Sequence, residues 1–347
     1  MNAKGLNELP LNGLIRYPVL SKLASLLGLC SICAAAYAQH DTSYYRNFKQ
    51  PYSVKFSLEK TGAGLEFSPD NSINLPTASF PFNSGVNAAI TVSYKILNFS
   101  ISKSLSTSTR NGSLVFATRF YSGSNVFGGK IGLYNNIASV RDKRNLNVET
   151  TIRLFKFTPY WLMTLNNKRF SISAISDFSQ QQKKSAGSFI FEISPMLSFA
   201  NGNGGQMIPA DAYYRSIFED QAGLERANLV NIDFRPGYAY TKVFEEGKYF
   251  LNGGLLLGPG FGYHAVNALK DYRGFHWQSS LRMMASAGMH QDKYFLVAYF
   301  RYMNSFTPVH TLGMLSHEGT IGLTIGLKFG ALEKKIPNNF NEIIRMK

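Results

Sequence analysis

The chain has 347 residues and a formal net charge of +15; charged residues make up only 16% of it and aromatic residues 14%. Its mean hydropathy of −0.11 is far from that of a helical membrane protein. Beyond the N-terminal segment no stretch approaches the ~18 consecutive apolar residues of a transmembrane helix, which excludes that class. The basic residues are scattered along the chain, which argues against a nucleic-acid partner.

The N-terminal segment has the three parts of a secretory signal peptide. Basic residues up to Lys22 precede an apolar run over 23–36, and an A-x-A site occupies 36–38. We therefore expect residues 1–38 to be a signal peptide, cleaved between Ala38 and Gln39. A short N-terminal membrane anchor is the alternative interpretation, although the apolar run is shorter than the ~20 residues that span a bilayer.

Both cysteines of the chain, Cys30 and Cys33, lie inside this N-terminal segment. The cleaved chain therefore has no thiol for a disulfide or for nucleophilic chemistry. No Cys/His cluster with metal-ligand spacing is present, so we expect no metal and no cofactor.

From about residue 84 the sequence alternates apolar and polar residues in segments separated by turn signals. The last segment is the most regular, with Leu323, Ile325 and Leu327 on one face and Thr324 and Gly326 on the other. This period of two is typical of a β-strand with one face in lipid. Twelve segments show the pattern: 84–95, 97–105, 113–121, 128–137, 147–165, 168–179, 186–200, 228–242, 248–263, 274–290, 293–305 and 321–329.

These segments predict an all-β fold, a transmembrane antiparallel up-and-down β-barrel over residues 84–330. Their length is close to the ~9–11 residues that a tilted strand needs to cross a bilayer. Because bacterial barrels have even strand numbers, we expect about 12 strands, within a range of 10 to 14. Residues 39–83 form an N-terminal segment with one extra strand possible at 52–60, and residues 331–347 form a C-terminal tail.

The connections differ in length. Residues 245–247 and 291–292 read as hairpin turns, whereas 201–227, 264–273 and 306–317 read as long loops. Short turns on one rim and long loops on the other are typical of bacterial barrels.

The stretch 166–191, NNKRFSISAISDFSQQQKKSAGSFIF, resembles the Bacteroidota family known as domain of unknown function 4421, and PGYAYTKVF at 236–244 is similar to a second block of that family. The resemblance implies an outer-membrane barrel and adds no chemistry. The resemblance covers residues 50–330, so the tail departs from it. Thr324-x-Gly326-x-x-Phe329 has the form of the signal for the barrel-insertion machinery, although here it lies inside the chain.

Charged residues that alternate with apolar ones are the first candidates for a functional lining, because in a barrel they point into the lumen. They are Glu149, Arg153, Asp177, Glu192, Asp233, Arg235, Arg282, Arg301 and Lys328. Unpaired charges in a narrow interior are costly, so a structural network of salt bridges is the first interpretation. A lining that sets solute selectivity is the second.

Two polar motifs are weaker candidates. The turn motif, between two predicted strands, consists of Gln182, Lys183, Lys184, Ser185, Gly187 and Ser188. It reads as an ordinary turn, with a ligand or partner contact as the alternative. The glycine-rich stretch 251–262 lacks the Lys-Ser/Thr of a phosphate loop, and its glycines make room for neighbours in the lumen.

His310 and Ser316-His317-Glu318 contain the residue types of a catalytic triad, which makes a hydrolase an alternative interpretation. Consecutive residues of a strand face opposite sides, so Ser316 and His317 do not both reach one site. We therefore expect no catalytic residues.

The sequence thus predicts a non-enzymatic outer-membrane barrel, either a narrow pore or a structural membrane protein. Its expected neighbours are outer-membrane lipids, including lipopolysaccharide, whose phosphates suit a basic protein. A barrel lipid hydrolase and a soluble periplasmic ligand-binding β-protein remain the alternatives. A lumen of about twelve strands lies between the filled interior of eight and the open channel of sixteen, so we expect it to be constricted or plugged.

Overall fold

The structure is a computed structural model that describes residues 41–48, 50–69, 78–82, 85–105, 112–140, 148–202, 205–208, 210, 212–309 and 312–330. The predicted signal peptide, the tail 331–347 and His310 lie outside these ranges. None of the helices in the described ranges is long and apolar enough to cross a membrane.

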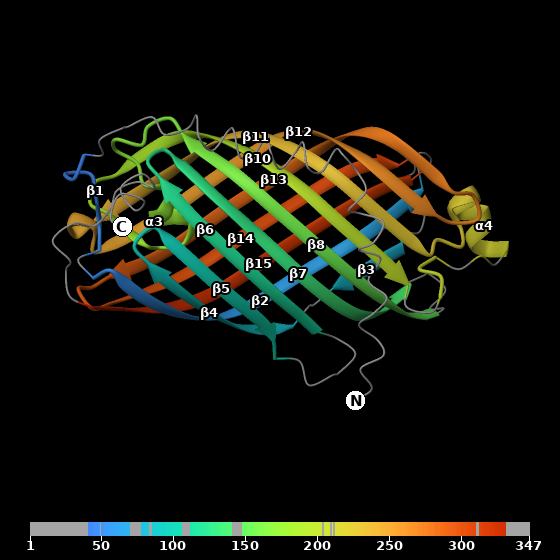
Figure 1. The fold of residues 1–347 in the computed structure, drawn as a ribbon, viewed down its shortest axis with the longest axis horizontal. Coiled ribbons are helices and arrows are strands. Elements are labelled where there is room, and N and C mark those ends of the chain that lie inside the picture. Colours follow the sequence, from blue (N-terminus) through green and yellow to red (C-terminus); the bar gives the residue numbers. More distant parts are fainter. Residues whose placement is uncertain are drawn as a thin grey trace, which may run out of the picture. The chain divides into compact units, whose positions relative to one another are not determined.

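Twelve long strands form a closed antiparallel barrel, which confirms the predicted fold class and strand number (Figure 1). In order around the barrel they are β2 (Tyr52–Pro69), β4 (Val86–Tyr94), β5 (Leu97–Ser104), β6 (Gly112–Ser122), β7 (Asn125–Val140), β8 (Val148–Thr164), β10 (Ala186–Gly202), β11 (Arg226–Phe244), β12 (Tyr249–Asn267), β13 (Tyr272–His290), β14 (Tyr294–Val309) and β15 (Leu312–Phe329).

The barrel closes where the last strand pairs with the first. β15 pairs antiparallel with β2 along its whole length, from Leu312 opposite Pro69 to Phe329 opposite Tyr52. A short strand, β3 (Ala78–Phe82), pairs with β2 beyond the end of β4. The segment 52–60, predicted as a possible extra strand, is therefore part of the strand that closes the barrel.

The predicted strand at 168–179 is wrong. This segment carries a one-turn helix, α3 (Ile172–Ser176), whose N-cap Ser171 accepts a hydrogen bond from the backbone N–H of Ala174. It is followed by β9 (Gln180–Gln182), which pairs with β1 (Tyr45–Asn47) in a separate two-stranded sheet. The correct strand number thus rests on two errors that cancel, one strand missed at the start and one added in the middle.

The barrel has a turn rim and a loop rim. Short connections join β4 to β5, β6 to β7, β11 to β12 and β13 to β14 at the turn rim; the third of them carries the 3-10 helix η3 (Glu245–Gly247). The connection 203–225 at the loop rim carries α4 (Ala212–Phe218) and η2 (Glu219–Gln221). Figure 1 shows α3 at one end of the barrel and α4 at the other.

Two of the predicted long loops are mostly strand. β12 continues to Asn267 before β13 starts at Tyr272, and β14 continues to Val309 before β15 starts at Leu312. The polar residues that suggested loops at 264–273 and 306–317 instead extend these strands. Strands of this length reach past the apolar belt into the aqueous region, where outward-facing polar side chains meet water rather than lipid.

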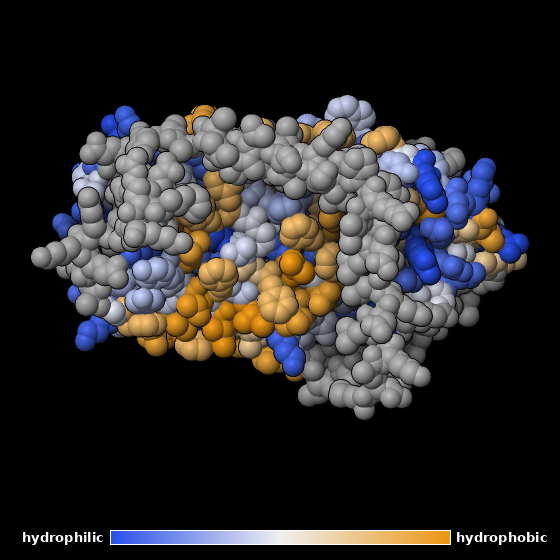
Figure 2. Space-filling model, in the orientation of Figure 1, coloured by the Kyte–Doolittle hydropathy of each residue, from blue (hydrophilic) through white to orange (hydrophobic). Residues whose placement is uncertain are grey.

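Side chains alternate between the lumen and the outer surface as predicted. In β15 Ile325 is 46% exposed, while its neighbour Thr324 is 3% exposed and shares a hydrogen bond with Ser57 across the lumen side of β2. In β12 the side chains that face outward are apolar from Tyr249 to Tyr263. At ~3.3 Å per residue and a strand tilt of ~40°, this stretch extends about 35 Å along the barrel axis. Figure 2 shows such a belt across the strands that face the viewer.

Candidate functional site

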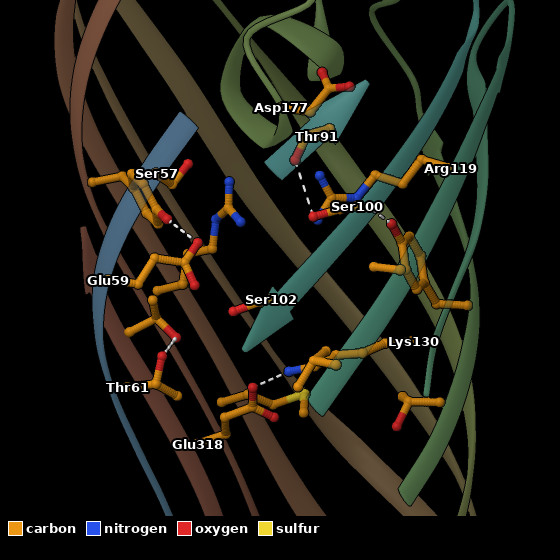
Figure 3. Close-up of a pocket in the computed structure, with 18 of the residues that line it drawn as sticks. Ser57, Glu59, Thr61, Thr91, Ser100, Ser102, Arg119, Lys130, Asp177 and Glu318 are labelled. Atoms are coloured by element: carbon orange, nitrogen blue, oxygen red, sulfur yellow. Dashed lines mark hydrogen bonds and ion pairs between the residues drawn. The ribbon is translucent and has the colours of Figure 1, made fainter. Parts of the chain in front are cut away.

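The middle of the lumen holds a polar cavity of about 230 Å³, which we call the chamber (Figure 3). Its wall comes from strands all around the barrel, because every second residue of each strand points inward. Six basic and four acidic side chains line it: Lys55, Arg119, Lys130, Arg235, Arg282 and Arg301, with Glu59, Asp177, Glu192 and Glu318. A single buried water needs roughly 10–15 Å³, so the chamber has room for several.

Glu192 of β10 organises one side of the chamber. Its two carboxylate oxygens accept from Arg235 Nη2 at 2.5 Å and from Arg282 Nη1 at 2.5 Å. Arg235 also donates to Asp233 at 3.0 Å, and Asp233 accepts from the amide of Gln278. Glu192 is 0% exposed and Arg235 is 1% exposed, so each charge depends on the others for solvation.

Other ion pairs join parts of the barrel interior that are distant in the sequence. Lys130 of β7 pairs with Glu318 of β15, at the end of the chamber away from Asp177 in Figure 3. Lys55 of β2 lies 3.8 Å from the carboxylate of Asp177 and donates to its backbone carbonyl at 2.5 Å. The first contact joins two strands of the wall across the lumen, and the second attaches Asp177 to β2.

The turn rim of the lumen is filled by residues 165–185, which we call the plug. β8 and β10 are paired neighbours, so the plug occupies the place of a hairpin turn between them. It folds inward, and Phe170, Ile172 and Ile175 pack against an apolar part of the inner wall that includes Ile190 and Leu256. The plug thereby closes the turn rim.

Polar contacts fix the inner tip of the plug to the chamber. The carbonyl of Ser176 accepts from Arg119 at 3.1 Å and from Arg301 at 2.6 Å, and its hydroxyl lies 2.9 Å from that of Tyr121. Asn252 of β12 donates to the carbonyl of Ala174 at 3.4 Å. The plug therefore forms one wall of the chamber.

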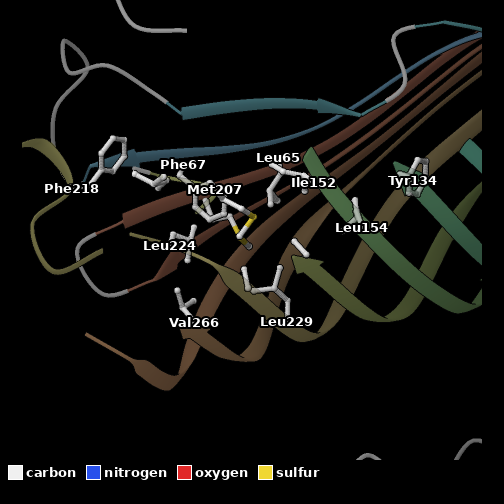
Figure 4. Close-up of a cluster of buried hydrophobic side chains, with 14 of the residues drawn as sticks. Leu65, Phe67, Tyr134, Ile152, Leu154, Met207, Phe218, Leu224, Leu229 and Val266 are labelled. Carbon is white, nitrogen blue, oxygen red and sulfur yellow. The ribbon is translucent and has the colours of Figure 1, made fainter. Parts of the chain in front are cut away.

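The loop rim is filled in a different way. The connection 205–225, which we call the lid, inserts Met207, Ile208, Phe218 and Leu224 into the barrel mouth (Figure 4). There they meet apolar inward-facing residues of five strands: Leu65, Phe67, Ile152, Leu154, Leu229, Val266 and Met314. The polar chamber is therefore bounded by an apolar cluster on the lid side and by the plug on the other.

The structure brings most of the predicted lumen residues together. Glu192, Asp233, Arg235, Arg282 and Arg301 point inward and belong to the chamber or its border. Asp177 also lines the chamber, but it does so from the plug rather than from a strand. Lys328 points inward near the turn rim, where it donates to the carbonyl of Gln291 at 2.6 Å and lies over the ring of Phe48.

Arg153 lies on the outer face, contrary to the prediction. In β8 it is Ile152 and Leu154 that point inward, because the lid requires apolar partners at the loop rim. At the loop rim apolar residues are thus inside and Arg153 is outside, which reverses the pattern found in the middle of the barrel. The side chain of Glu149 lies outside the described residues.

The turn motif belongs to the plug and its junction with β10. Gln182 is buried, accepts from the backbone N–H of Ser171 at 3.0 Å and donates to the carbonyl of Arg169 at 2.6 Å. Ser185 and Ser188 accept backbone N–H groups of Val243 and Asn166.

The remaining members of the motif lie at the same junction. Lys183 is close to the carbonyl of Thr42, Lys184 lies over the ring of Tyr44, and Gly187 leaves no room for a Cβ beside Tyr238. The contacts of the motif are therefore with the protein itself.

Several chamber residues were not predicted: Lys55, Glu59, Arg119, Lys130 and Glu318. Lys55 and Glu59 alternate with Val54, Phe56 and Leu58, so the signal is present in the segment 39–83, which the prediction leaves outside the barrel.

Ser316 and Glu318 border the lumen, and His317 between them faces the opposite side of β15. The described residues hold no group of three or more His, Cys, Asp or Glu that suits a metal ion.

Comparison with solved structures finds β-barrels of the outer membrane. The chain is similar to the outer membrane protease OmpT from Escherichia coli, with 8% identity, a TM-score of 0.35, and coverage of 82% of this chain and 98% of that chain. It is also similar to the β domain of the Bordetella autotransporter BrkA, with 9% identity, a TM-score of 0.38, and coverage of 80% and 99%.

A third similar structure is the toluene transporter TodX of P. putida, with 6% identity, a TM-score of 0.27, and coverage of 85% and 99%. No curated protein matches the sequence. Residues 39–329, which include the whole barrel, match a family of otherwise undefined role, and the chain therefore belongs to the family described as Domain of unknown function (DUF4421).

Proposed function

We propose that the protein is a non-enzymatic, gated narrow pore of the outer membrane, and that the structure represents its closed state. The proposal rests on the chamber, a polar cavity in the barrel axis between two closures. A barrel with a purely structural role gains most from an interior packed with side chains. An interior that keeps room for water and ten charged groups suits the passage of a small hydrophilic solute instead.

The plug is the better candidate for the gate. Polar contacts to the carbonyls of Ser176 and Ala174 hold its tip, and water can replace them when the plug moves. Its apolar contacts with the inner wall come from few side chains, among them Phe170. The lid is held by a large apolar cluster whose exposure to water is expensive. In this proposal the surrounding lipids, including lipopolysaccharide, and the barrel-insertion machinery are the partners of the outer wall.

Conductance in planar bilayers tests the gate. Phe170 is a buried plug residue that packs on the inner wall, and replacing a buried Phe by Ala costs about 3–5 kcal/mol. If that energy holds the plug closed, Phe170→Ala raises the open probability by a factor of about 100 or more, since ~1.4 kcal/mol is tenfold.

Phe189→Ala is the matched control, because the side chain of Phe189 is 65% exposed on the outer face of β10. Its contact with a closure is through the backbone carbonyl that accepts from Leu165, and the substitution keeps that carbonyl. We expect rare openings for the wild type and this control, and frequent openings for Phe170→Ala. Heat-modifiable migration in electrophoresis verifies that each variant is folded. A folded Phe170→Ala barrel with the wild-type conductance would contradict the proposal.

A further inference from the structure

The chamber contains two guanidinium groups that no carboxylate of the described residues contacts directly, although Asp177 attracts Arg119 and Glu59 attracts Arg301 from a greater distance. Of its basic residues, Lys55 contacts Asp177, Lys130 contacts Glu318, and Arg235 and Arg282 share Glu192. Arg119 and Arg301 make no ion pair with any of the described residues. Glu59, the remaining acid of the chamber, accepts a hydrogen bond from Tyr299.

These two arginines lie side by side, because both donate to the same carbonyl oxygen of Ser176. Arg119 is oriented by a second bond, from Nε to the hydroxyl of Tyr160 at 2.8 Å, and the guanidinium of Arg301 lies 4.7 Å from the centre of the Tyr299 ring. A carbonyl carries only a partial charge, so it does not balance two cations. A guanidinium has five N–H donors, and each group here keeps donors that no described residue accepts.

A third donor next to Arg119 is also unused. Asn98 of β5 is the register partner of Arg119 of β6, and it lines the same chamber. It is 3% exposed, and neither its amide nitrogen nor its amide oxygen has a hydrogen-bond partner among the described residues. An unsatisfied buried amide costs about 1–3 kcal/mol, which a bound ligand would recover.

Excess positive charge, spare donors and open volume therefore occur at one place. We propose that the chamber binds a small tetrahedral oxyanion of the phosphate class between the guanidinium groups of Arg119 and Arg301, with the amide of Asn98 as a further donor. Arginine suits this class because its planar fork matches two oxygens of a phosphate. An anion of this class would be the solute of the pore proposed above, and the site rests on that pore only for the route by which the anion reaches the chamber.

Retention of labelled phosphate tests the site without requiring the pore to open. The full barrel is refolded from urea into detergent in the presence of ³³P-labelled inorganic phosphate, desalted, and counted per folded barrel. For the wild type we expect retention near one phosphate per barrel, prevented by excess sulfate but not by equal chloride. Retention no greater than that of heat-unfolded protein would overturn the site.

Variants locate the binding. Arg119→Gln and Arg301→Gln should each lower retention at least tenfold, whereas Arg153→Gln, which removes an arginine from the outer face, should leave it unchanged. If a folded variant that carries both Arg119→Gln and Arg301→Gln retains as much phosphate as the wild type, the assignment of the site to these two arginines is overturned. If the glutamine variants do not fold, Arg301→Lys keeps the charge but loses the fork, and unchanged retention by Arg301→Lys would likewise count against it.

Two further arms separate the sources of the anion and the two proposals. Glycerol 3-phosphate should compete with inorganic phosphate for the site if the natural ligand is a phosphate monoester. It should not compete if the natural ligand is free phosphate. Both results support the site, because the recognised group is the same. A barrel that retains phosphate but never conducts would refute the pore and leave the site. One that conducts without retaining phosphate would refute the site and leave the pore.

Discussion

Glu192→Gln should destabilise the barrel more than the loss of any exposed carboxylate, because Glu192 solvates two arginines inside the lumen. Both of its oxygens are used, at 2.5 Å each, by Arg235 and Arg282. The substitution is nearly isosteric, so it creates no cavity and changes mainly the charge. Removing one partner of a buried ion pair costs about 3–5 kcal/mol.

The structure places this variant at the lower end of that range. Glutamine keeps one acceptor oxygen, and Arg235 keeps its bond to Asp233 at 3.0 Å, while Arg282 loses its carboxylate contact but is partly solvated by the chamber. We therefore expect a loss of about 3 kcal/mol in the free energy of unfolding. The double variant Glu192→Gln with Arg282→Gln should recover part of it, because the stranded cation is gone.

Urea titration in detergent micelles, followed by tryptophan emission, measures the effect. Trp277 is on the outer face, so its emission reports whether the barrel is embedded in detergent. Glu246→Gln, at an exposed turn, is the control and should stay within ~0.5 kcal/mol of the wild type. A loss below 1 kcal/mol for Glu192→Gln would refute the reasoning that this network stabilises the lumen.

Three more outcomes are expected. Ile325→Arg should lower the yield of heat-modifiable barrel and cost about 2–4 kcal/mol in the free energy of unfolding. Ile325 lies roughly 10 Å along the barrel axis from Phe329, whose ring is at the interface, so Ile325 is near mid-bilayer. The control Phe329→Arg should cost only about 1 kcal/mol. Equal effects of these two would show that the belt is misplaced. Gly258→Ala should destabilise the barrel by about 1–3 kcal/mol, because the added Cβ would collide with the carbonyl oxygen of Phe234. A stable variant would mean that the register between β11 and β12 is wrong. Intact-mass analysis of membrane-extracted protein should give a chain beginning at Gln39; full-length chain in the cytosol would contradict export.

The outer surface of the barrel could be predicted from the sequence because lipid enforces one rule along every strand. In the middle of β10 to β15 most outward residues are apolar, and the alternation of Leu323, Thr324 and Ile325 identifies the two faces of the last strand. The lumen obeys no such single rule. Ile152 and Leu154 point inward because the lid covers them, so the same alternation placed Arg153 on the wrong side.

The plug could not be recognised from periodicity for a related reason. Phe170, Ile172 and Ala174 alternate with Ser171 and Ser173 as in a membrane strand. In the structure both sets are buried. Phe170 and Ile172 pack on the wall, and the two serine hydroxyls donate to the side-chain oxygen of Gln180 within the plug, at 2.5 Å each. A segment buried on all sides can show a period of two without belonging to a sheet, and only the pairing of β8 with β10 excludes it from the barrel.

That pairing also has a consequence for the gate proposed above. The first and last residues of the plug start from adjacent points of the turn rim, and the N–H of Leu165 bonds to the carbonyl of Phe189 at 3.0 Å across its base. If the plug opens as proposed, both of its ends stay attached to the barrel, which keeps its local concentration at the closed position in the millimolar range. Reclosure would then be a first-order event that dilution of the protein does not slow. A single proteolytic cut within the plug would leave each half attached at one end only, and in the proposed pore we expect brief openings to become lasting ones.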